Sequence, residues 1–578
     1  MKKYILLIIA LLIGTFLRMW QLSSVPNGLT WDEAAIGYNA YSLLKTGRDE
    51  HGTFMPLVFK SFGDYKPGAY IYLTVPSVAI FGLNEFAVRF PSALAGILAI
   101  FGIYLLTNEL FSIIQTKKTN NSEPITNNFS TGSFTALALA ISPWMVHFSH
   151  GAWEVNVFTT LTIFALYYFL RFLKGKSALY PSLLLACLSL ATYQAAKLLT
   201  PLVFLLFITL YWKEFWYWFT PYLKPKKLRS LFPFILFGLW IFFGSVFGSA
   251  GNRLTTLSIF NYKPGISAEA KAIDNQNPVI LDLFHNQKEL SSRLVLSRYL
   301  YHFSPEVLFY EGPIVSERGH LPGLGVLNPL EFIWLVLGFI WLVKRLSPGS
   351  HDTPDRSTAL ILGLLLIAPI PASLTLAEFS TVRALFMAVP LAIISGIGMY
   401  YYLEKMKSLI SVIPGLTRNL YKFSIFLIFI FYFFISFYVF DVYFNHSQTV
   451  FATEFNYGYK QVVQIIKDHP AKKVVFTDVY GQPYIYYVFY TAYDPAIYQK
   501  TNDFISGGLD VGRVDRVGNV EFHQFGSSDM MTQPDTLFIG SEGNINNQFD
   551  IAGPNIDLFR QIETPDHHIL FRVIKTKP

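Results

Sequence analysis

The chain has 578 residues, of which 52% are hydrophobic, 17% aromatic and only 14% charged, a composition far from that of soluble proteins. Its formal charge of +7 is uneven: the tail from residue 443 onward carries 11 Lys and Arg against 15 Asp and Glu, or −4, which leaves +11 elsewhere. A basic surplus between hydrophobic runs orients a membrane protein and does not indicate nucleic-acid binding. The single cysteine, Cys187, excludes an intrachain disulfide framework and a cysteine metal cluster.

Apolar runs long enough to cross a bilayer as helices recur about eleven times along the chain. They lie near residues 4–20, 89–112, 132–149, 156–172, 178–194, 197–212, 231–249, 329–344, 358–374, 383–402 and 423–442. The first run has a basic start, but it contains Arg18 and lacks a small-residue cleavage site, so it predicts an uncleaved span. A further run, 68–84, is short, contains a proline and is ambiguous.

The basic loops decide how the run 68–84 is placed, because Lys and Arg in short loops favour the cytoplasm. If 68–84 does not span, every basic cluster falls on one side, whereas a spanning segment would move all but the first cluster outside. The pattern therefore predicts an interfacial segment at 68–84 within a long first outer loop, about 21–88. The N-terminus is then cytoplasmic and the tail extracytoplasmic, in a multi-pass protein of the plasma (inner) membrane.

The tail alternates a helix-like piece, 456–468, with β-rich runs at 472–479, 537–541 and 569–575. It predicts a small extracytoplasmic α/β domain over 443–578, after a mainly α transmembrane bundle over 1–442. The Tyr-rich segment 480–495 favours a core strand with edge aromatics, and stacking on glycans is the alternative.

The stretch Thr30-Trp31-Asp32-Glu33 opens the first outer loop's helical segment. It fits a capping box, in which acids also suit the first turn. A catalytic interpretation is favoured by position, because the amphipathic helix that follows would lie on the membrane surface. Its N-terminal acids would then point into the cavity that the spans enclose.

A second acid, Glu154, lies in the short turn 149–156 between two spans. An ionisable group so close to the bilayer is costly unless it lines a wet cavity or meets a partner. Pairing with His150 or His147 is the structural alternative. Together, the two outer-face carboxylate sites predict a general base or a divalent-metal site at Asp32 and Glu154.

Cations on the same face point to an anionic ligand. Lys66 begins the interfacial segment, and Arg383 begins the span 383–402. Arg383 alone fits a side chain that snorkels toward water, but the two cations together predict a phosphate site at the membrane surface.

The long outer loop 250–328 mixes aromatic residues with polar ones, which suits sugar or headgroup binding. Its polar candidates are Arg253, His302, Glu311, Arg318 and His320. Each histidine on its own favours a structural role. The chain shows no nucleophilic serine elbow, no phosphate-cradling glycine loop and no HExxH zinc signature.

These residues together resemble a known family. The Asp-Glu pair, the segment YKPGAYIYL (65–73), the entry FGLNEFAVRFPSALAG (81–96) and the acid in the next outer turn are similar to membrane glycosyltransferases of the C superfamily (GT-C). The nearest groups are the protein O-mannosyltransferases of glycosyltransferase family 39 and the lipid A aminoarabinose transferases. The resemblance covers about residues 1–400 in topology, and its specific motifs lie mostly in 26–100 and 142–156.

The resemblance implies a polyprenyl-phosphate monosaccharide donor and transfer of a hexose or pentose, with inversion, to a hydroxyl of a glycan, lipid or protein. By the family pattern, the catalytic acids are Asp32, with Glu33 beside it, and Glu154, and the donor-phosphate contacts are Lys66 and Arg383. Weaker substrate-binding candidates are Tyr65, His150, His302, Arg318 and His320. Relatives often have Asp where Glu154 stands and Arg where His150 stands, so a divalent metal at Asp32 and Glu154 is left open.

Two other classes of protein are alternatives. An ion-coupled secondary transporter would use such outer-face carboxylates as ion sites, but those sites belong on broken helices in paired repeats, and no repeat is visible. A surface receptor that uses its membrane part only as an anchor would not need eleven spans.

Overall fold

The computed structural model describes residues 4–115, 130–246, 259, 287–312, 317–346, 356–412, 418–507, 512–545 and 553–578. The chain divides into two compact units, each made of segments that are far apart in sequence. Unit 1 comprises 1–18, 95–147 and 155–440, and unit 2 comprises 19–94, 148–154 and 441–578. The tail thus shares unit 2 with most of the first outer loop, and a domain boundary at residue 442 stays a prediction.

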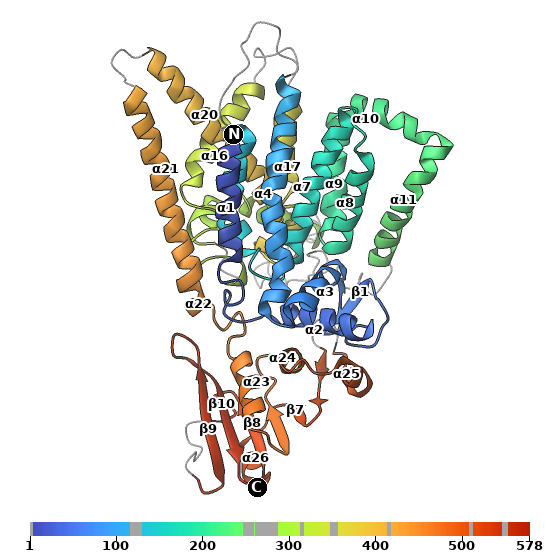
Figure 1. Cartoon of the computed structure of the whole chain (residues 1–578), viewed down its shortest axis with the longest axis vertical. Coiled ribbons are helices and arrows are strands. Elements are labelled where there is room, and N and C mark those ends of the chain that lie inside the picture. Colours follow the sequence, from blue (N-terminus) through green and yellow to red (C-terminus); the bar gives the residue numbers. More distant parts are fainter. Residues whose placement is uncertain are drawn as a thin grey trace, which may run out of the picture. The chain divides into compact units, whose positions relative to one another are not determined.

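Unit 1 is helical, and each of the eleven predicted runs falls on one or more helices (Figure 1). The long helices are α1 (Ile5–Met19), α4 (Glu85–Gln115), α5 (Thr131–Ala140), α7 (Glu154–Leu173), α8 (Leu179–Thr192), α9 (Ala196–Leu210), α11 (Pro225–Val246), α15 (Gln287–Tyr301), α16 (Glu331–Leu346), α17 (Arg356–Ile367), α20 (Ala388–Val412) and α21 (Arg418–Asp441). Shorter ones are α6 (Pro143–His147), α10 (Trp212–Phe219), α18 (Ile370–Ser373) and α19 (Thr381–Ala384). Helices suit apolar runs in a bilayer because they satisfy their own backbone hydrogen bonds.

Five described helical segments are long and apolar enough to cross a membrane, and a pair bent by 97° would make a sixth. The five are Glu85–Ser112, Glu154–Leu173, Arg356–Ser373, Thr381–Ser408 and Phe426–Val450, and the bent pair joins Ala196–Leu210 to Trp212–Leu223. Other predicted runs form shorter apolar helices, such as α1 and α8. The chain is therefore a multi-pass membrane protein, and the number of eleven spans stays a prediction.

Close helix packing in unit 1 rests on glycines between α16 and α20. A Cβ atom on Gly398 would lie 1.9 Å from the Trp334 carbonyl oxygen, and one on Gly338 would lie 2.1 Å from that of Ile394. Small residues let two membrane helices approach backbone to backbone. Any larger side chain at either position would push α16 and α20 apart.

The first outer loop in unit 2 forms α2 (Trp31–Thr46), the hairpin β1 (Val58–Ser61) and β2 (Asp64–Pro67), and α3 (Ala69–Phe81). A helix at the ambiguous run 68–84 is thus present as α3, which is shorter than a span. The sequence predicts that the helix containing Asp32 lies on the membrane surface. In the structure this helix, α2, is instead buried along most of its length. It is covered by α3 and by two helices of the tail, α24 (Pro483–Tyr490) and α25 (Pro495–Thr501).

The tail is built on a six-stranded sheet with the order β6-β7-β3-β8-β10-β9. Its strands are β3 (Lys473–Phe476), β6 (Arg516–Val517), β7 (Val520–Phe522), β8 (Thr536–Gly540), β9 (Ile556–Glu563) and β10 (Ile569–Thr576), and a separate pair comprises β4 (Phe504–Ile505) and β5 (Arg513–Val514). β3 runs parallel to β7 and β8, whereas the outer pairs are antiparallel. The three predicted β-runs fall on β3, β8 and β10, and the predicted helix falls on α23 (Tyr459–Asp468).

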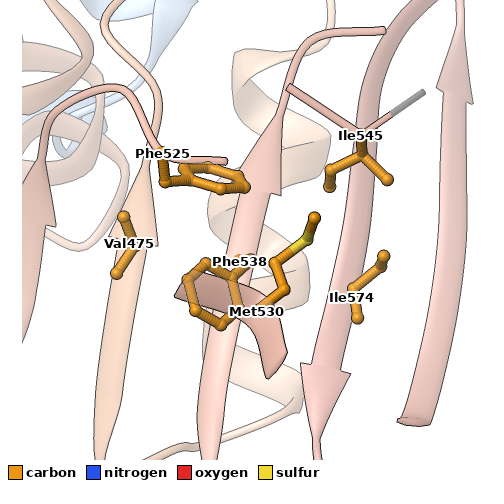
Figure 2. Packing of buried hydrophobic residues seen from close by; sticks show 6 residues of the cluster. All are labelled: Val475, Phe525, Met530, Phe538, Ile545 and Ile574. Carbon is orange, nitrogen blue, oxygen red and sulfur yellow. The ribbon is translucent and has the colours of Figure 1, made fainter. Parts of the chain in front are cut away.

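The core on one face of this sheet is a cluster of Val475, Phe525, Met530, Phe538, Ile545 and Ile574 (Figure 2). Met530 reaches it from α26 (Ser527–Thr532). The prediction of a core strand in 480–495 is wrong, because this segment contains the helix α24. Pro483 suits a first helical turn, and neighbours along α24, from Tyr484 to Tyr486, are all buried. A buried helix needs no alternation of polar and apolar residues.

Candidate active site

Asp32 stands in the first turn of α2, at the position that the sequence predicts. Thr30 caps the helix: its Oγ1 accepts a hydrogen bond from the Glu33 amide at 3.3 Å, and its own amide donates to Glu33 Oε2 at 3.0 Å. The predicted capping box is therefore present. Glu33 serves the cap, which leaves the neighbouring Asp32 side chain, 48% exposed, to face a cavity.

Glu33 belongs to a buried network centred on Arg89, which lies in α4. Glu33 Oε1 accepts from Arg89 Nε at 3.0 Å and from the Ala152 amide at 3.1 Å. The guanidinium of Arg89, fully buried, also donates to the carbonyl oxygens of Leu22, Pro26 and Gly28. A buried ion pair needs this degree of satisfaction to offset its desolvation. The network ties the start of α2 to α4 and to the turn that carries Glu154.

Lys66 reaches Asp32 from the hairpin. It lies in β2 opposite Phe59, and its ammonium donates a hydrogen bond to Asp32 Oδ1. Its side chain is only 9% exposed, and its Nζ lies 5.3 Å from the centre of the Phe62 ring. The aromatic ring and the carboxylate together stabilise an ammonium that is largely removed from water.

Asp32, Lys66 and Glu154 line the same small cavity of about 10 Å³, together with Ala35, Ile36, Asn39, Phe59, Ser61 and Ile71. This is room for about one water molecule. The structure thus brings together three of the predicted residues, which come from the start of α2, from β2 and from the start of α7. Two carboxylates and an ammonium around a small cavity can accept a proton and hold an anion.

Asn39, which lines this cavity, forms two hydrogen bonds with the buried acid Glu50. Its Nδ2 donates to Glu50 Oε1 at 2.9 Å, and its Oδ1 accepts from the Glu50 amide at 3.0 Å. Burial raises the pKa of Glu50 to about 8, because a carboxylate is poorly solvated there. Glu50 is therefore mostly protonated at neutral pH.

Other predicted residues of unit 2 have different surroundings. His150 is buried, its Nε2 lies 3.1 Å from the Trp20 carbonyl oxygen, and its ring packs against Tyr443 and Phe444. Tyr65 follows the alternation of β2 and so points to the opposite face of the hairpin from Lys66. Substrate binding by His150 and Tyr65 stays a prediction.

The remaining candidates lie in unit 1. Arg383 Nη1 contacts the hydroxyl groups of Thr375 and Ser380, at 3.3 and 3.4 Å. His302 stacks on Phe379 with ring centres 4.5 Å apart. The Arg318 carbonyl oxygen lies 2.7 Å from His147 Nε2.

Two further candidates of the long outer loop are His320 and Arg253. His320 packs beside Gly312, where a Cβ atom would come within 2.7 Å of the histidine ring. Arg253 lies outside the described residues. Substrate or phosphate binding by the unit 1 residues Arg383, His302, Arg318 and His320 stays a prediction.

Arg89 and Asn39 were not among the residues predicted for the site. Arg89 had a sequence signal, since an arginine in the apolar segment FAVRFPSALAG must have a partner or a wet cavity. Asn39 had none, because an asparagine in a helix is common and its partner Glu50 is known only from the fold.

A divalent cation fits this cavity poorly. Lys66 already places an ammonium on Asp32, and the side-chain oxygen of Asn39 is used by Glu50. Calcium and magnesium usually require about six oxygen ligands, and the described residues contain no group of three or more His, Cys, Asp or Glu arranged to hold a metal. We therefore derive no step through a metal, and its use stays a prediction.

Residues 8–114 match the family model of dolichyl-phosphate-mannose-protein mannosyltransferases. The match contains the capping box, Asp32, Lys66 and Arg89, so the predicted resemblance to C-superfamily glycosyltransferases is confirmed over this segment. No curated protein sequence matches the chain.

Some solved structures are distantly similar to this chain. ArnT from Cupriavidus metallidurans, bound to undecaprenyl phosphate, is 12% identical with a TM-score of 0.49, and the match covers 98% of this chain and 97% of that one. Archaeal oligosaccharyltransferase AglB from Archaeoglobus fulgidus, in complex with an inhibitory peptide and a dolichol-phosphate, is 13% identical with a TM-score of 0.46. That match covers 84% of this chain and 63% of AglB, so it spans less than two thirds of AglB.

Proposed function

We propose that the protein is a membrane glycosyltransferase that moves a hexose or pentose from a polyprenyl-phosphate donor to an acceptor hydroxyl on the extracytoplasmic face. The observation that carries this proposal is the cavity shared by Asp32, Lys66 and Glu154. Its first two residues lie within the segment that matches the mannosyltransferase family model. The acceptor is a glycan, a lipid or a protein.

Asp32 acts as the general base. Its carboxylate accepts the proton of the acceptor hydroxyl while that oxygen forms a bond to the anomeric carbon of the donor. The bond between the anomeric carbon and the phosphate oxygen breaks, and its electron pair leaves with the polyprenyl phosphate. Attack from the opposite side inverts the anomeric carbon.

Lys66 stabilises the departing phosphate. An ammonium has three N–H donors, so Lys66 can hold Asp32 and donate to a phosphate oxygen at the same time. The leaving phosphate needs charge stabilisation rather than a proton, and a fixed cation in a largely dry site supplies it without reorganisation. Arg383 is proposed as a second phosphate contact, and Glu154 as the acid that completes the polar cavity.

Glu33 and Arg89 are positioning residues in this proposal. Both oxygens of Glu33 are engaged by the cap, the guanidinium and the Ala152 amide. A carboxylate with these partners is poorly placed to accept a proton from substrate. Its effect on transfer is instead to hold the first turn of α2, and with it Asp32.

The test is transfer of radiolabelled sugar from a panel of polyprenyl-phosphate monosaccharides into membranes that contain the full-length protein. We expect Asp32→Asn to lower the rate by about 10² to 10⁴-fold, because an amide cannot accept the proton. Its thermal unfolding midpoint should fall less than that of Glu33→Gln, since the asparagine oxygen can still accept from Lys66 and the capping box and Arg89 network remain. The same assay with a chelator tests the use of a metal.

Glu33→Gln is the matched comparison, because it makes the same chemical change one residue away. It leaves a buried guanidinium without its counter-charge, so its main effect should be a lower unfolding midpoint. Transfer that survives in folded Asp32→Asn would contradict the proposed base. A folded wild type that consumes no donor in the panel, but whose ion-coupled uptake depends on Asp32, would favour a transporter.

A further inference from the structure

We propose that a second cavity in unit 2, beside Trp31, binds one ring of a neutral sugar and is the acceptor site of the enzyme. The assignment to the acceptor rests on the proposed function, whereas sugar binding itself does not. The cavity has a volume of about 260 Å³ and is lined by Trp31, Asp478, Gly481, Gln482, Pro483, Tyr484, Arg513, Val514 and Phe522. Pockets for drug-sized ligands measure about 300 to 1,000 Å³, so this volume suits a smaller ligand.

Aromatic rings form the apolar part of the cavity lining. They are contributed by Trp31 of α2, Tyr484 of α24 and Phe522 of β7. The Trp31 ring lies near Gly481, where a Cβ atom would be 3.5 Å from it. A sugar ring has a flat C–H face that packs on aromatic side chains, which combine a large apolar area with little flexibility.

Three side chains in the lining have buried oxygen atoms that lack a partner in the described part of the chain: the Asp478 carboxylate, the Gln482 amide and the Tyr484 hydroxyl. Asp478 Oδ1 and Gln482 Oε1 make no hydrogen bond to any other described residue. Such groups are rare in proteins and need an explanation. The Gln482 amide is oriented by its Nε2, which donates to the Gly512 carbonyl oxygen at 2.8 Å, so its oxygen is left as the acceptor. Two fixed acceptors match the hydroxyl donors of a sugar.

The backbone at Gln482 supports a functional role for this position. Gln482 has φ +36° and ψ 46°, in the left-handed region that non-glycine residues seldom adopt. Strain of this kind persists where the surrounding structure imposes it, and it is concentrated at binding sites. Arg513 adds a cation at the exposed rim, where its Nε lies 3.1 Å from Asp515 Oδ1.

Two contacts within unit 2 link the lining of the cavity beside Trp31, here called the sugar cavity, to the lining of the cavity shared by Asp32, Lys66 and Glu154, here called the charged cavity. Trp31 directly precedes Asp32, so one backbone step separates a wall of the sugar cavity from the proposed base. Phe62 bridges the other side: its ring centre lies 6.1 Å from that of Tyr484 and 5.3 Å from Lys66 Nζ. An acceptor ring held beside Trp31 is therefore close to the groups that would activate its hydroxyl.

The experiment measures direct binding of methyl glycosides of glucose, galactose and mannose to the full-length protein in lipid nanodiscs, by saturation-transfer NMR and calorimetry. We expect at least one glycoside to bind. Asp478→Asn removes the charge that strengthens a hydrogen bond from a sugar hydroxyl, and Gln482→Gly removes the acceptor itself, so each should weaken binding about tenfold. Glycine also suits the left-handed backbone at 482, so that change adds no strain.

Asp468→Asn is the matched control, because Asp468 is an exposed aspartate of the same tail on α23, and binding should be unchanged. The proposal is overturned if the folded wild type binds no glycoside, or if Asp478→Asn binds as well as the wild type.

The outcomes also separate this proposal from the proposed function. If Asp32→Asn abolishes transfer but Asp478→Asn leaves the KM for acceptor unchanged, the transferase stands and the acceptor site is overturned. If glycoside binding depends on Asp478 while no donor is consumed, the sugar site stands and the transferase does not.

Discussion

Single buried acids in unit 2 have contrasting surroundings. Glu33 is buried beside a guanidinium, which compensates its charge. Glu50 is buried as deeply, but its side chain accepts from a neutral amide, that of Asn39. The guanidinium therefore offsets the charge of Glu33, whereas Glu50 is stable in the interior chiefly when it holds a proton.

The raised pKa of Glu50 predicts a dependence of stability on pH. Because the pKa is about 8 in the folded chain and about 4.5 when exposed, the folded state binds more protons between these values. The free energy of unfolding therefore falls as pH rises through this range. Burial lowers the pKa of His51 to about 4, which gives the opposite trend below about 6.5. From pH 6.5 to 8 the His51 contribution is therefore absent, whereas that of Glu50 remains.

We expect the wild type to lose up to about 2 kcal/mol between pH 6.5 and 8. Glu50→Gln should flatten this slope, because glutamine keeps an oxygen for Asn39 and does not titrate. Thermal unfolding of the full-length protein at several pH values measures the effect, with Glu563→Gln, at an exposed position, as control. Parallel pH profiles for wild type and Glu50→Gln would contradict the assignment.

Among the elements, α24 shows how packing overrides local preference. Its sequence, PYIYYVFY, is rich in β-formers, yet it folds as a helix because it packs against α2 and α23. β-propensity is a weak preference that depends on context. The aromatic side chains of α24 thereby serve two purposes, since most fill the interior of unit 2 and Tyr484 lines the sugar cavity.

The packing of α26 against the sheet contributes to the stability of the tail, and two neighbouring methionines allow this contribution to be measured. Met530 is 2% exposed in the core cluster shown in Figure 2, whereas the adjacent Met531 is 69% exposed. We expect Met530→Ala to destabilise the tail by about 2 to 5 kcal/mol and Met531→Ala by less than about 0.5 kcal/mol. Hydrogen exchange of the β8 amides in the full-length protein reports this difference. Equal effects would show that α26 does not contribute to the core as described.

In the whole molecule, unit 2 is assembled from three separate segments of the chain. It joins the first outer loop, a short turn and the tail, with 53 residues between the first two segments and 286 between the last two. All of the Asp32, Lys66 and Glu154 constellation lies in this unit, together with the sugar cavity. The tail is therefore part of the unit that holds the proposed chemistry.

The predicted orientation places this unit outside the cytoplasm. Cys187 is the chain's one cysteine, so Cys187→Ser provides a cysteine-free background. In it, Asp566→Cys should react with a membrane-impermeant maleimide in intact cells, and Lys176→Cys should react only after permeabilisation, because basic loops remain cytoplasmic. Both positions are exposed. The reverse pattern of labelling would show that the topology is the opposite of the predicted one and that the proposed site lies in the cytoplasm.

Features that depend on local pattern could be predicted from the sequence. Apolar runs predicted the helices, the spacing Thr30 to Glu33 predicted the cap, and the family match over residues 8–114 includes the first outer loop. The tertiary structure alone decided which partners these residues have. Arg89 meets Glu33, Glu50 meets Asn39, and Trp31 meets the tail across 450 residues of chain. The physical reason is that helix formation follows from neighbours three or four residues apart. Burial and pairing of a charge instead depend on segments that only folding brings together.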